Sequence, residues 1–398
     1  MHLEDGIPIG RFEAANRIFM APCTRHRATI DEVPTPRMVK YYADRASAGL
    51  IISEGISPEP RGRGYYFTPG AYNDAQQDGW VPIARAVHAR GGRIFGQIMH
   101  CGRISDPALQ PDGALPIAPS AVQPDPNFRG YTMACPRPKR HHFTPRALET
   151  EEIPRLVDSF ADAARRLVAA GFDGVELHGA SGYLPMQFLS SSSNRREDAY
   201  GGDVAGRARF VLDIIDAMGG AIGNDRVAIK LAPAFRFHDV HDDDPVSLYS
   251  YVAKMLSNRG LAYVQASSYG DYCSYSHFDP IGLVRANYEG VLVANGGFSR
   301  ESAEQAIQDG KADAVAFGTA FIANPDLPER FKQTQLLNVH DPETFYTQGD
   351  AGYNDYPKLG EAADPARLAG YEGTQAADLE SYRRGTRVPS RTTIPTEY

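Results

Sequence analysis

Residues 172–210 join a short apolar run to side chains that bind through hydrogen bonds or move protons. The run, residues 175–177, is predicted to be a buried strand. His178, Ser181 and Tyr183 follow it in a glycine-containing turn, before a polar loop and a new helix. Folds of alternating strands and helices place their chemistry at the carboxyl ends of parallel strands. We therefore expect these three side chains to lie in an active site.

Lys230 and two glycine-rich loops are the next candidates for a binding site. Lys230 ends the apolar run 226–231, where an unpaired lysine between two covered sheet faces is rare. We expect it to contact a cofactor or substrate. The sequences NGGF (295–298) and FGTAF (317–321) follow the last two predicted strands. Bare backbone amides at such loops commonly bind phosphate, which predicts a phosphate site near Gly296, Gly297 and Gly318.

Eight apolar runs alternate with helical patterns over about 320 residues. They are rich in Ile, Val and Leu and mostly lack polar alternation, as expected for strands covered on both faces. We predict strands at 17–22, 50–54, 93–98, 173–177, 226–231, 262–266, 291–294 and 314–317. Helical patterns such as 154–170 and 206–222 are long enough to cross over to a parallel neighbour. The count predicts a (β/α)8 barrel. A doubly wound open sheet is the alternative, but no GxGxxG follows a strand.

Two segments depart from the repeat. Residues 105–150 carry many prolines and few periodic apolar residues, so we predict a capping insertion after the third strand. The last residues, 379–398, are polar and are expected to form a flexible tail. The predicted organisation is one barrel domain over residues 1–378, with that tail after it.

Composition excludes several classes of protein. A net charge of −8 gives no support for nucleic-acid binding, and no apolar run is long enough to span a bilayer. The acidic, polar start MHLEDGIPIG is unlike a secretory signal. Four scattered cysteines and the histidines lack ligand spacing, so no metal site is predicted. We expect a cytoplasmic protein that acts on a small molecule, as a monomer or homodimer.

Ordered motifs from residue 16 to about residue 359 resemble one family. They are NRIFMAPCTRHRA, YYADRASAGLIISEG, GGRIFGQIMHCGR, LQPDGALPIAPSA, PRALETEEI, HGASGYLPMQFL with SNRREDAYGG, FIANPDL, and TFYTQGDAGYNDYP. Together they are similar to the Old Yellow Enzymes, the FMN-dependent ene-reductases. The resemblance implies a barrel in which NADPH reduces FMN, hydride passes to the β-carbon of an activated alkene, and a protein acid protonates the α-carbon.

The resemblance also implies roles for individual residues. Tyr183 matches the proton donor, His178 and Ser181 the residues that bind the substrate oxygen, and Tyr346 a substrate-side tyrosine. A tyrosine, with an ordinary pKa near 10, suits protonation of a developing carbanion or enolate. The positions that match FMN-binding residues are Pro22, Cys23, Thr24, Gly55, Gln97, Lys230, Gly296, Gly297, Gly318 and Thr319.

Four positions differ from the usual family pattern. Ser181 stands where most members have asparagine or histidine, so one donor to the substrate oxygen is shortened or lost. Thr319 replaces an arginine that pairs with the FMN phosphate, and threonine cannot supply bidentate charged bonds. Lys230 replaces an arginine but keeps the charge, and Met99 replaces a bulky tryptophan.

These differences leave two hypotheses. The first is an NAD(P)H-dependent flavin ene-reductase that acts on an α,β-unsaturated carbonyl compound, in a specialised biosynthetic pathway. The second is a redox-neutral isomerase or cyclase on the same fold, with weakened or lost flavin use. In that case His178, Tyr183 and Lys230 would do acid–base work.

Overall fold

The computed structural model describes residues 1–125, 143–233, 235–268 and 279–361. Eight strands close into a parallel barrel, in the order β10-β11-β12-β3-β4-β5-β8-β9. Their bounds are β3 Ile18–Met20, β4 Ile51–Ile56, β5 Ile94–Ile98, β8 Gly174–Gly179, β9 Val227–Leu231, β10 Tyr263–Ser267, β11 Leu292–Asn295 and β12 Ala314–Phe317. Each overlaps a predicted strand, so the predicted (β/α)8 barrel is confirmed. The open-sheet alternative is wrong, because β12 pairs with β3 and closes the sheet.

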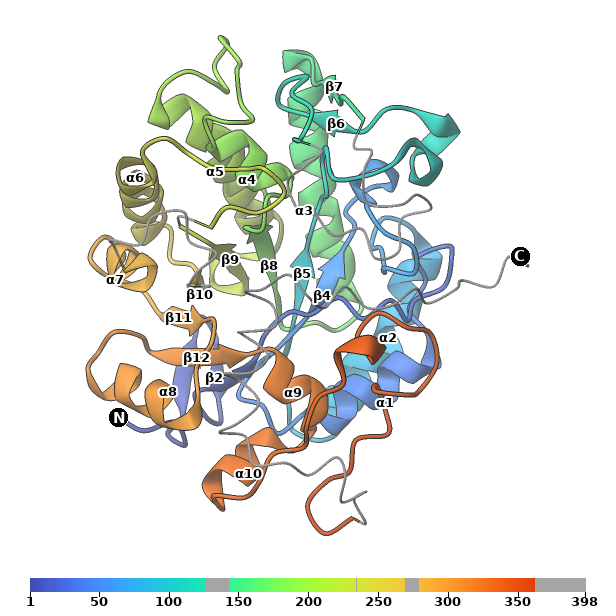
Figure 1. Cartoon of the computed structure of the whole chain (residues 1–398), viewed down its shortest axis with the longest axis vertical. Coiled ribbons are helices and arrows are strands. Elements are labelled where there is room, and N and C mark those ends of the chain that lie inside the picture. Colours follow the sequence, from blue (N-terminus) through green and yellow to red (C-terminus); the bar gives the residue numbers. More distant parts are fainter. Residues whose placement is uncertain (126–142, 234, 269–278, 362–398) are drawn as a thin grey trace.

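Helices surround the barrel (Figure 1). Their bounds are α1 Pro36–Asp44, α2 Asp74–His88, α3 Ile153–Ala169, α4 Leu184–Leu189, α5 Val204–Ile222, α6 Pro245–Ser257, α7 Pro280–Arg285, α8 Arg300–Gln308, α9 Thr319–Ala323 and α10 Leu327–Lys332. Side-chain oxygens of Asn73, Asp203, Asp244 and Ser299 accept backbone N–H bonds at four helix starts. Such bonds satisfy N–H groups that a helix leaves unpaired, so these residues help to fix where the helices begin.

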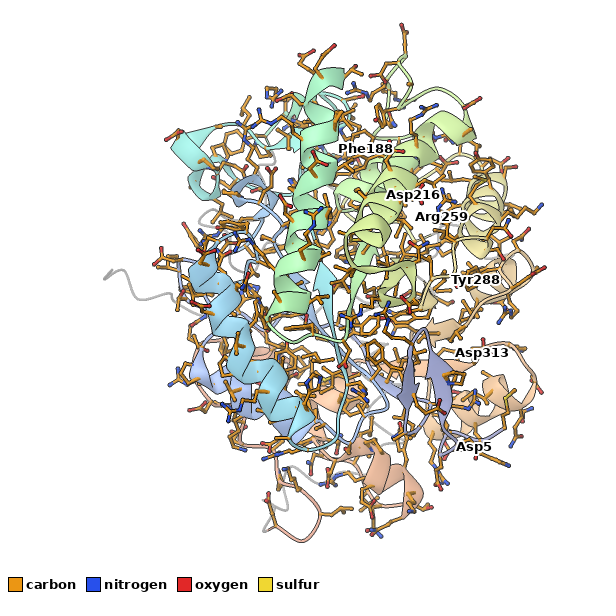
Figure 2. The ribbon with its side chains drawn as sticks, turned by 180° about the vertical axis from the view of Figure 1, so that it is seen from behind. Asp5, Phe188, Asp216, Arg259, Tyr288 and Asp313 are labelled. Atoms are coloured by element: carbon orange, nitrogen blue, oxygen red, sulfur yellow. The ribbon has the colours of Figure 1, made fainter. Side chains whose placement is uncertain are left out.

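The helix layer is held by aromatic packing and by ion pairs. The ring of Phe188 on α4 stacks on Phe210 of α5, with centroids 4.0 Å apart. Figure 2 labels Asp216 of α5 beside Arg259, which follows α6. The Arg259 guanidinium donates to both oxygens of this carboxylate at 2.7 and 2.9 Å. These contacts keep α4, α5 and α6 together on the side of the barrel that carries β8 and β9.

A short hairpin precedes the first barrel strand. It consists of β1 (Ile7–Ile9) and β2 (Phe12–Ala14), paired antiparallel. Its apolar side chains are buried with Phe19, Phe95 and Tyr263 of the barrel strands. The hairpin therefore closes the amino-terminal end of the barrel and leaves the carboxyl ends of the strands for the site.

In its described residues, 105–125 and 143–150, the predicted capping insertion contains short elements. They are η2 (Pro107–Leu109), η3 (Pro111–Gly113), β6 (Ile117–Ala118), β7 (Arg146–Ala147) and η4 (Thr150–Glu152), with β6 and β7 paired in parallel. The predicted flexible tail, 379–398, lies outside the described residues. Among the residues that the structure describes, no helix has the length and apolarity to cross a bilayer.

Candidate active site

Polar side chains from five adjacent strands form a buried belt inside the barrel. They are Gln97 on β5, Glu176 on β8, Lys230 on β9, Gln265 on β10 and Asn295 on β11. Gln97 donates to Glu176 Oε1 at 2.8 Å, and Lys230 Nζ donates to Asn295 Oδ1 at 3.3 Å. The Gln265 amide fits between the charges when its nitrogen faces Glu176 Oε2 (3.3 Å) and its oxygen faces Lys230 Nζ (3.2 Å). The belt thus links one carboxylate to one cation.

Two buried carboxyl groups of the barrel hold their protons more tightly than usual. Burial raises the pKa of Glu176 to about 7, although Lys230 acts in the opposite direction. Burial also raises the pKa of Glu54, on β4, to about 7, opposed by bonds from the Arg25 backbone and from Tyr42. Perturbed carboxyl groups of this kind are typical of functional sites.

His178 lies at the end of β8, opposite Lys230 of β9 in the strand register. Its imidazole is buried, and its Nδ1 atom has no hydrogen-bond partner among the described residues. Burial, and next the Lys230 charge, hold the pKa of His178 well below its usual value. The ring is therefore neutral near pH 7 and carries one N–H donor, which suits a contact with a ligand oxygen.

The turn after β8 has an unusual backbone. Ser181 and Gly182 both have positive φ angles, 57° and 75°. A methyl group on Gly182 would lie 2.5 Å from the Phe237 carbonyl oxygen, so only glycine fits here. His238, in the loop after β9, bonds through Nδ1 to the Ser181 carbonyl at 3.0 Å. The β9 loop thus holds the turn that presents Ser181 and Tyr183.

Tyr183 lies among side chains from several loops. Its ring centroid is 5.2 Å from that of His178 and 5.3 Å from that of His238. Its hydroxyl oxygen is 2.8 Å from the hydroxyl oxygen of Tyr65, which comes from the loop after β4. Burial raises the pKa of Tyr183, and the bond from Tyr65 lowers it. The structure therefore brings the predicted residues His178 and Tyr183 together, with Tyr65 beside them.

The loop after β3 and the segment around Tyr346 form another wall. Pro22, Cys23 and Thr24 are half-buried there. Tyr346 is 39% exposed, and its ring lies 5.3 Å from that of the buried His26. This arrangement puts Tyr346 on the side of the loop after β3.

Two buried arginines of the loop after β3 attach the segment that carries Tyr346. Arg25 donates to the carbonyl oxygens of Phe345 (3.0 Å) and Gly352 (2.7 Å). Arg27 donates to the carbonyl oxygens of Thr344, Phe345, Gly349 and Ala351. We call this pair, Arg25 and Arg27, the arginine clasp.

The predicted phosphate loops differ in the space around each glycine. Gly296 has φ of 116°, and a Cβ there would lie 1.8 Å from the Ser268 carbonyl oxygen. Among the described residues, a Cβ on Gly297 would have nothing within 4 Å, and one on Gly318 would meet only Cys23 Sγ, at 3.5 Å. Thr319 is exposed at the start of α9. Bare, accessible backbone at Gly297 and Gly318 fits a bound phosphate.

Gly55 and Gln97, which are predicted to contact the flavin, both contact other residues of the protein. A Cβ on Gly55 would lie 2.7 Å from Met99 Sδ, so the Met99 side chain covers this glycine. Gln97 gives its amide to Glu176. Open glycine backbone, a buried cation and a neutral donor imidazole nevertheless fit FMN, which presents a phosphate, a ring with hydrogen-bonding edges and negative charge on reduction.

Sequence reasoning missed Glu54, Glu176, His26 and His238. Both glutamates stand inside apolar strand runs, the same signal that identified Lys230. His238 lies in a loop without periodicity, and its positive φ of 53° has no reliable sequence signal. Tyr65 and Tyr66 both lie in the loop after β4, and it is Tyr65 that bonds to Tyr183.

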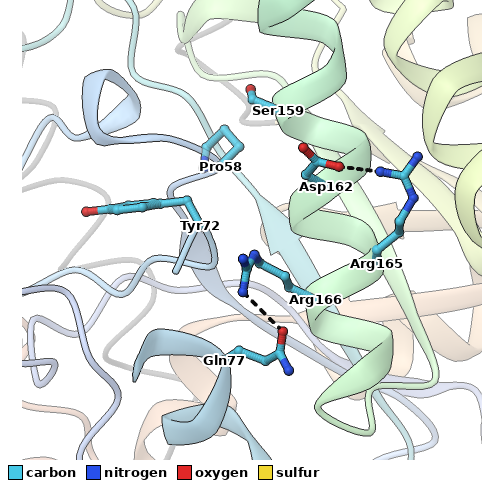
Figure 3. A pocket seen from close by; sticks show the side chains of 7 residues that line it. All are labelled: Pro58, Tyr72, Gln77, Ser159, Asp162, Arg165 and Arg166. Atoms are coloured by element: carbon cyan, nitrogen blue, oxygen red, sulfur yellow. Dashed lines mark hydrogen bonds and ion pairs between the residues drawn. The ribbon is translucent and has the colours of Figure 1, made fainter. Parts of the chain in front are cut away.

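A pocket lies between α2, α3 and the segment before α2, and none of the residues above lines it (Figure 3). Its volume is about 450 Å³, and its lining residues are Pro58, Tyr72, Gln77, Ser159, Asp162, Arg165 and Arg166. Its two arginines are paired, Arg165 with Asp162 and Arg166 with Asp74. We therefore assign the chemistry to the barrel mouth. Among the described residues, no group of three His, Cys, Asp or Glu side chains is placed to hold a metal ion.

Comparison with known proteins gives a consistent set of matches. Residues 4–338 match the model of the NADH:flavin oxidoreductase / NADH oxidase family. A probable flavin mononucleotide-dependent alkene reductase from Leishmania infantum is 43% identical over 88% of this chain and 95% of its own length. The 12-oxophytodienoate reductase 1 of Oryza sativa subsp. japonica is 40% identical, over 90% of this chain and 93% of its own.

Solved structures agree with these matches. Morphinone reductase in complex with tetrahydroNAD is 43% identical, with a TM-score of 0.84, over 92% of this chain and 99% of its own. The Old Yellow Enzyme homologue from Zymomonas mobilis is 41% identical, with a TM-score of 0.86, over 90% of this chain and 100% of its own.

Proposed function

Since the chain belongs to the NADH:flavin oxidoreductase / NADH oxidase family and is an FMN-dependent ene-reductase of the Old Yellow Enzyme type, we propose how its residues divide the work. His178 and Ser181 bind the oxygen of an α,β-unsaturated carbonyl compound. Tyr183 gives a proton to the α-carbon. NADPH is the reductant. The observation that carries this proposal is the contact of His178 with Tyr183 at the barrel mouth, one strand from Lys230.

The proposed FMN site uses the residues that the family resemblance indicated. Thr24, Gly55, Gln97 and Lys230, with Pro22 and Cys23, would surround the ring. Gly296, Gly297, Gly318 and Thr319 would hold the phosphate. FMN held by these residues would supply hydride transfer between the nicotinamide and the alkene. Lys230 stabilises negative charge in this site, since a fixed buried cation shifts the potential of a bound cofactor.

The substrate oxygen gains negative charge during reduction, and the protein must supply donors to it. The neutral imidazole of His178 has one N–H, and the Ser181 hydroxyl has one O–H. We propose that both donate to this oxygen. Ser181 is shorter than the usual asparagine or histidine, and Met99 is smaller than tryptophan. The altered pocket supports a bulky substrate, such as an intermediate of a specialised biosynthetic pathway.

Proton delivery follows from the environment of Tyr183. The side chain is half-buried at the mouth, within reach of a substrate held at His178. Its pKa stays above neutrality, so the phenol keeps its proton until a carbanion or enolate develops. Matches to named reductases over most of the chain favour this reaction over the redox-neutral isomerase or cyclase.

The test separates the two halves of the reaction. In Tyr183→Phe, reduction of the FMN-loaded enzyme by NADPH should keep its rate within about twofold. Oxidation of the reduced enzyme by 2-cyclohexenone should slow by about 10²- to 10⁴-fold, the usual contribution of a general acid. Tyr66→Phe, on the neighbouring residue, is the control. Full oxidation rate in Tyr183→Phe would refute the proton-donor role.

We further propose a cytoplasmic monomer or homodimer. Cys23 and Cys101, the described cysteines, are free thiols, as expected in a reducing compartment. Size-exclusion chromatography with light scattering distinguishes the two assembly states.

A further inference from the structure

Tyr65 makes a contact that the proposed mechanism does not yet use. Its side chain is 7% exposed, and its hydroxyl oxygen lies 2.8 Å from that of Tyr183. The two rings are perpendicular, with centroids 6.4 Å apart. The Tyr65 carbonyl accepts bonds from Thr68 Oγ1 at 3.1 Å and from Arg63 Nε at 3.3 Å. The loop therefore fixes the backbone from which this hydroxyl reaches Tyr183.

The direction of this bond follows from the proposed role of Tyr183. When Tyr183 points its proton at the substrate, its oxygen can only accept a hydrogen bond, so Tyr65 must donate. The surroundings are apolar, because Met99, Cys101 and Ile104 pack against the two tyrosines. A phenolate left on Tyr183 in this cluster needs a donor, since an unpaired buried charge is strongly disfavoured. Tyr65 is placed to be that donor.

From these contacts we infer that Tyr65 is a positioning residue for proton transfer: it donates a hydrogen bond to Tyr183 and then restores the proton that Tyr183 has lost. In the first step the Tyr183 O–H bond breaks as the substrate C–H bond forms. In the second, the Tyr65 O–H bond breaks as the Tyr183 O–H bond re-forms. Water then supplies one proton to Tyr65 per turnover, and no electrons move. This inference rests on the proposed function, because it requires Tyr183 to be the acid.

The structure also indicates the side of the barrel mouth from which water would return a proton to Tyr65. The ring of His26 lies 6.0 Å from that of Tyr65 and 5.3 Å from that of the exposed Tyr346. His26 Nδ1 has no hydrogen-bond partner within the described part of the chain. Burial lowers the pKa of His26 to about 3, so its ring is neutral and keeps an acceptor nitrogen. Water at this side of the mouth would therefore reach Tyr65 past side chains that accept and donate hydrogen bonds.

The experiment uses Tyr65→Phe, which keeps the ring and removes the hydroxyl. Oxidation of the reduced holoenzyme by 2-cyclohexenone should slow by about 10- to 150-fold, the value of one hydrogen bond to a charged group. The solvent isotope effect on this step should rise, because proton transfer becomes more limiting. Reduction of FMN by NADPH and the thermal unfolding midpoint should stay unchanged, which a general structural defect would not allow. Tyr66→Phe should match the wild type in every readout.

The double variant Tyr65→Phe with Tyr183→Phe completes a double-mutant cycle. It should be no slower than Tyr183→Phe alone, because Tyr65 acts only through Tyr183. Wild-type oxidation rate and isotope effect in Tyr65→Phe would overturn the inference while a slow Tyr183→Phe keeps the proposed function. Wild-type rates in Tyr183→Phe would overturn both. Additive losses in the double variant would also refute the inference, since they would show that Tyr65 acts independently.

Discussion

The three glycines of the proposed phosphate loops form a matched set for substitution by alanine. Gly318 has a negative φ of −91°, and of the residues that the structure describes a methyl group there would meet only Cys23 Sγ, at ordinary contact distance. Gly297 has no described residue close to an added Cβ, but its φ is 70°, which L-residues rarely adopt. Gly296 has both a positive φ and a carbonyl oxygen, that of Ser268, at 1.8 Å from the added carbon. The series therefore separates ligand contact from backbone strain.

The expected effects follow from these surroundings. Gly318→Ala should leave the free energy of unfolding of the apoprotein within about 0.5 kcal/mol of the wild type. If its backbone approaches the phosphate, the methyl group removes one charged hydrogen bond, about 1.5–3 kcal/mol. FMN should then bind about 10- to 150-fold more weakly. Gly297→Ala should lose about 1–2 kcal/mol of stability from the left-handed backbone. Gly296→Ala should fail to fold, because the carbonyl cannot be accommodated.

Two measurements on flavin-free protein give these quantities. Urea denaturation gives the free energy of unfolding, and titration with FMN, followed by quenching of flavin fluorescence, gives Kd. Wild-type affinity in Gly318→Ala would refute the placement of the phosphate at this loop. A stable Gly296→Ala protein with wild-type unfolding would refute the steric reasoning itself.

Two further predictions concern charge. Because the pKa of Glu176 is raised from 4.5 to about 7, the folded state binds its proton more tightly; its contribution to stability is full below about pH 4.5 and is lost as the pH rises to about 7. The temperature at which the apoprotein unfolds should decrease as the pH is raised from 5 to 7. Glu176→Gln should reduce this decrease by about half, since Glu54 titrates in the same range. If scanning calorimetry gave the same pH dependence for the variant and the wild type, the prediction would be contradicted. Thr319→Arg should tighten FMN binding by about tenfold through a charged, forked contact, and a salt-independent, unchanged Kd in fluorescence titration would show that α9 does not face the phosphate.

Much of the barrel could be predicted because its strands are buried on both faces. Such strands are short apolar runs between helices, and each of the eight was found within about two residues. The two strands of the hairpin β1–β2 were not among the predicted strands, because three-residue strands give no usable periodicity. Lys230 was identified as a charge inside an apolar run, and the same argument would have identified Glu176 of the polar belt, and Glu54 on β4.

The geometry of the site could not be predicted in the same way. The contact between Tyr65 and Tyr183 joins loops that are 118 residues apart, and nothing local in either loop indicates it. The positive φ angles of Ser181 and His238 depend on the contact between the two turns that carry them. For Gln97, the strand that carries it was predicted, but its hydrogen bond to Glu176 was not.

The arginine clasp has a consequence for the order in which the chain can assemble. Arg25 and the carbonyl of Phe345 that it binds are 320 residues apart. During synthesis the amino-terminal residues emerge first. The guanidinium groups of Arg25 and Arg27 therefore lack their carbonyl acceptors in residues 344–352 until that segment has been synthesised. The barrel mouth is then the last part of the fold to close, because a contact of this sequence separation requires the intervening chain to be in place. A ribosome-bound fragment that ends before Thr344 would present the strands of the barrel with an unfinished, water-filled mouth.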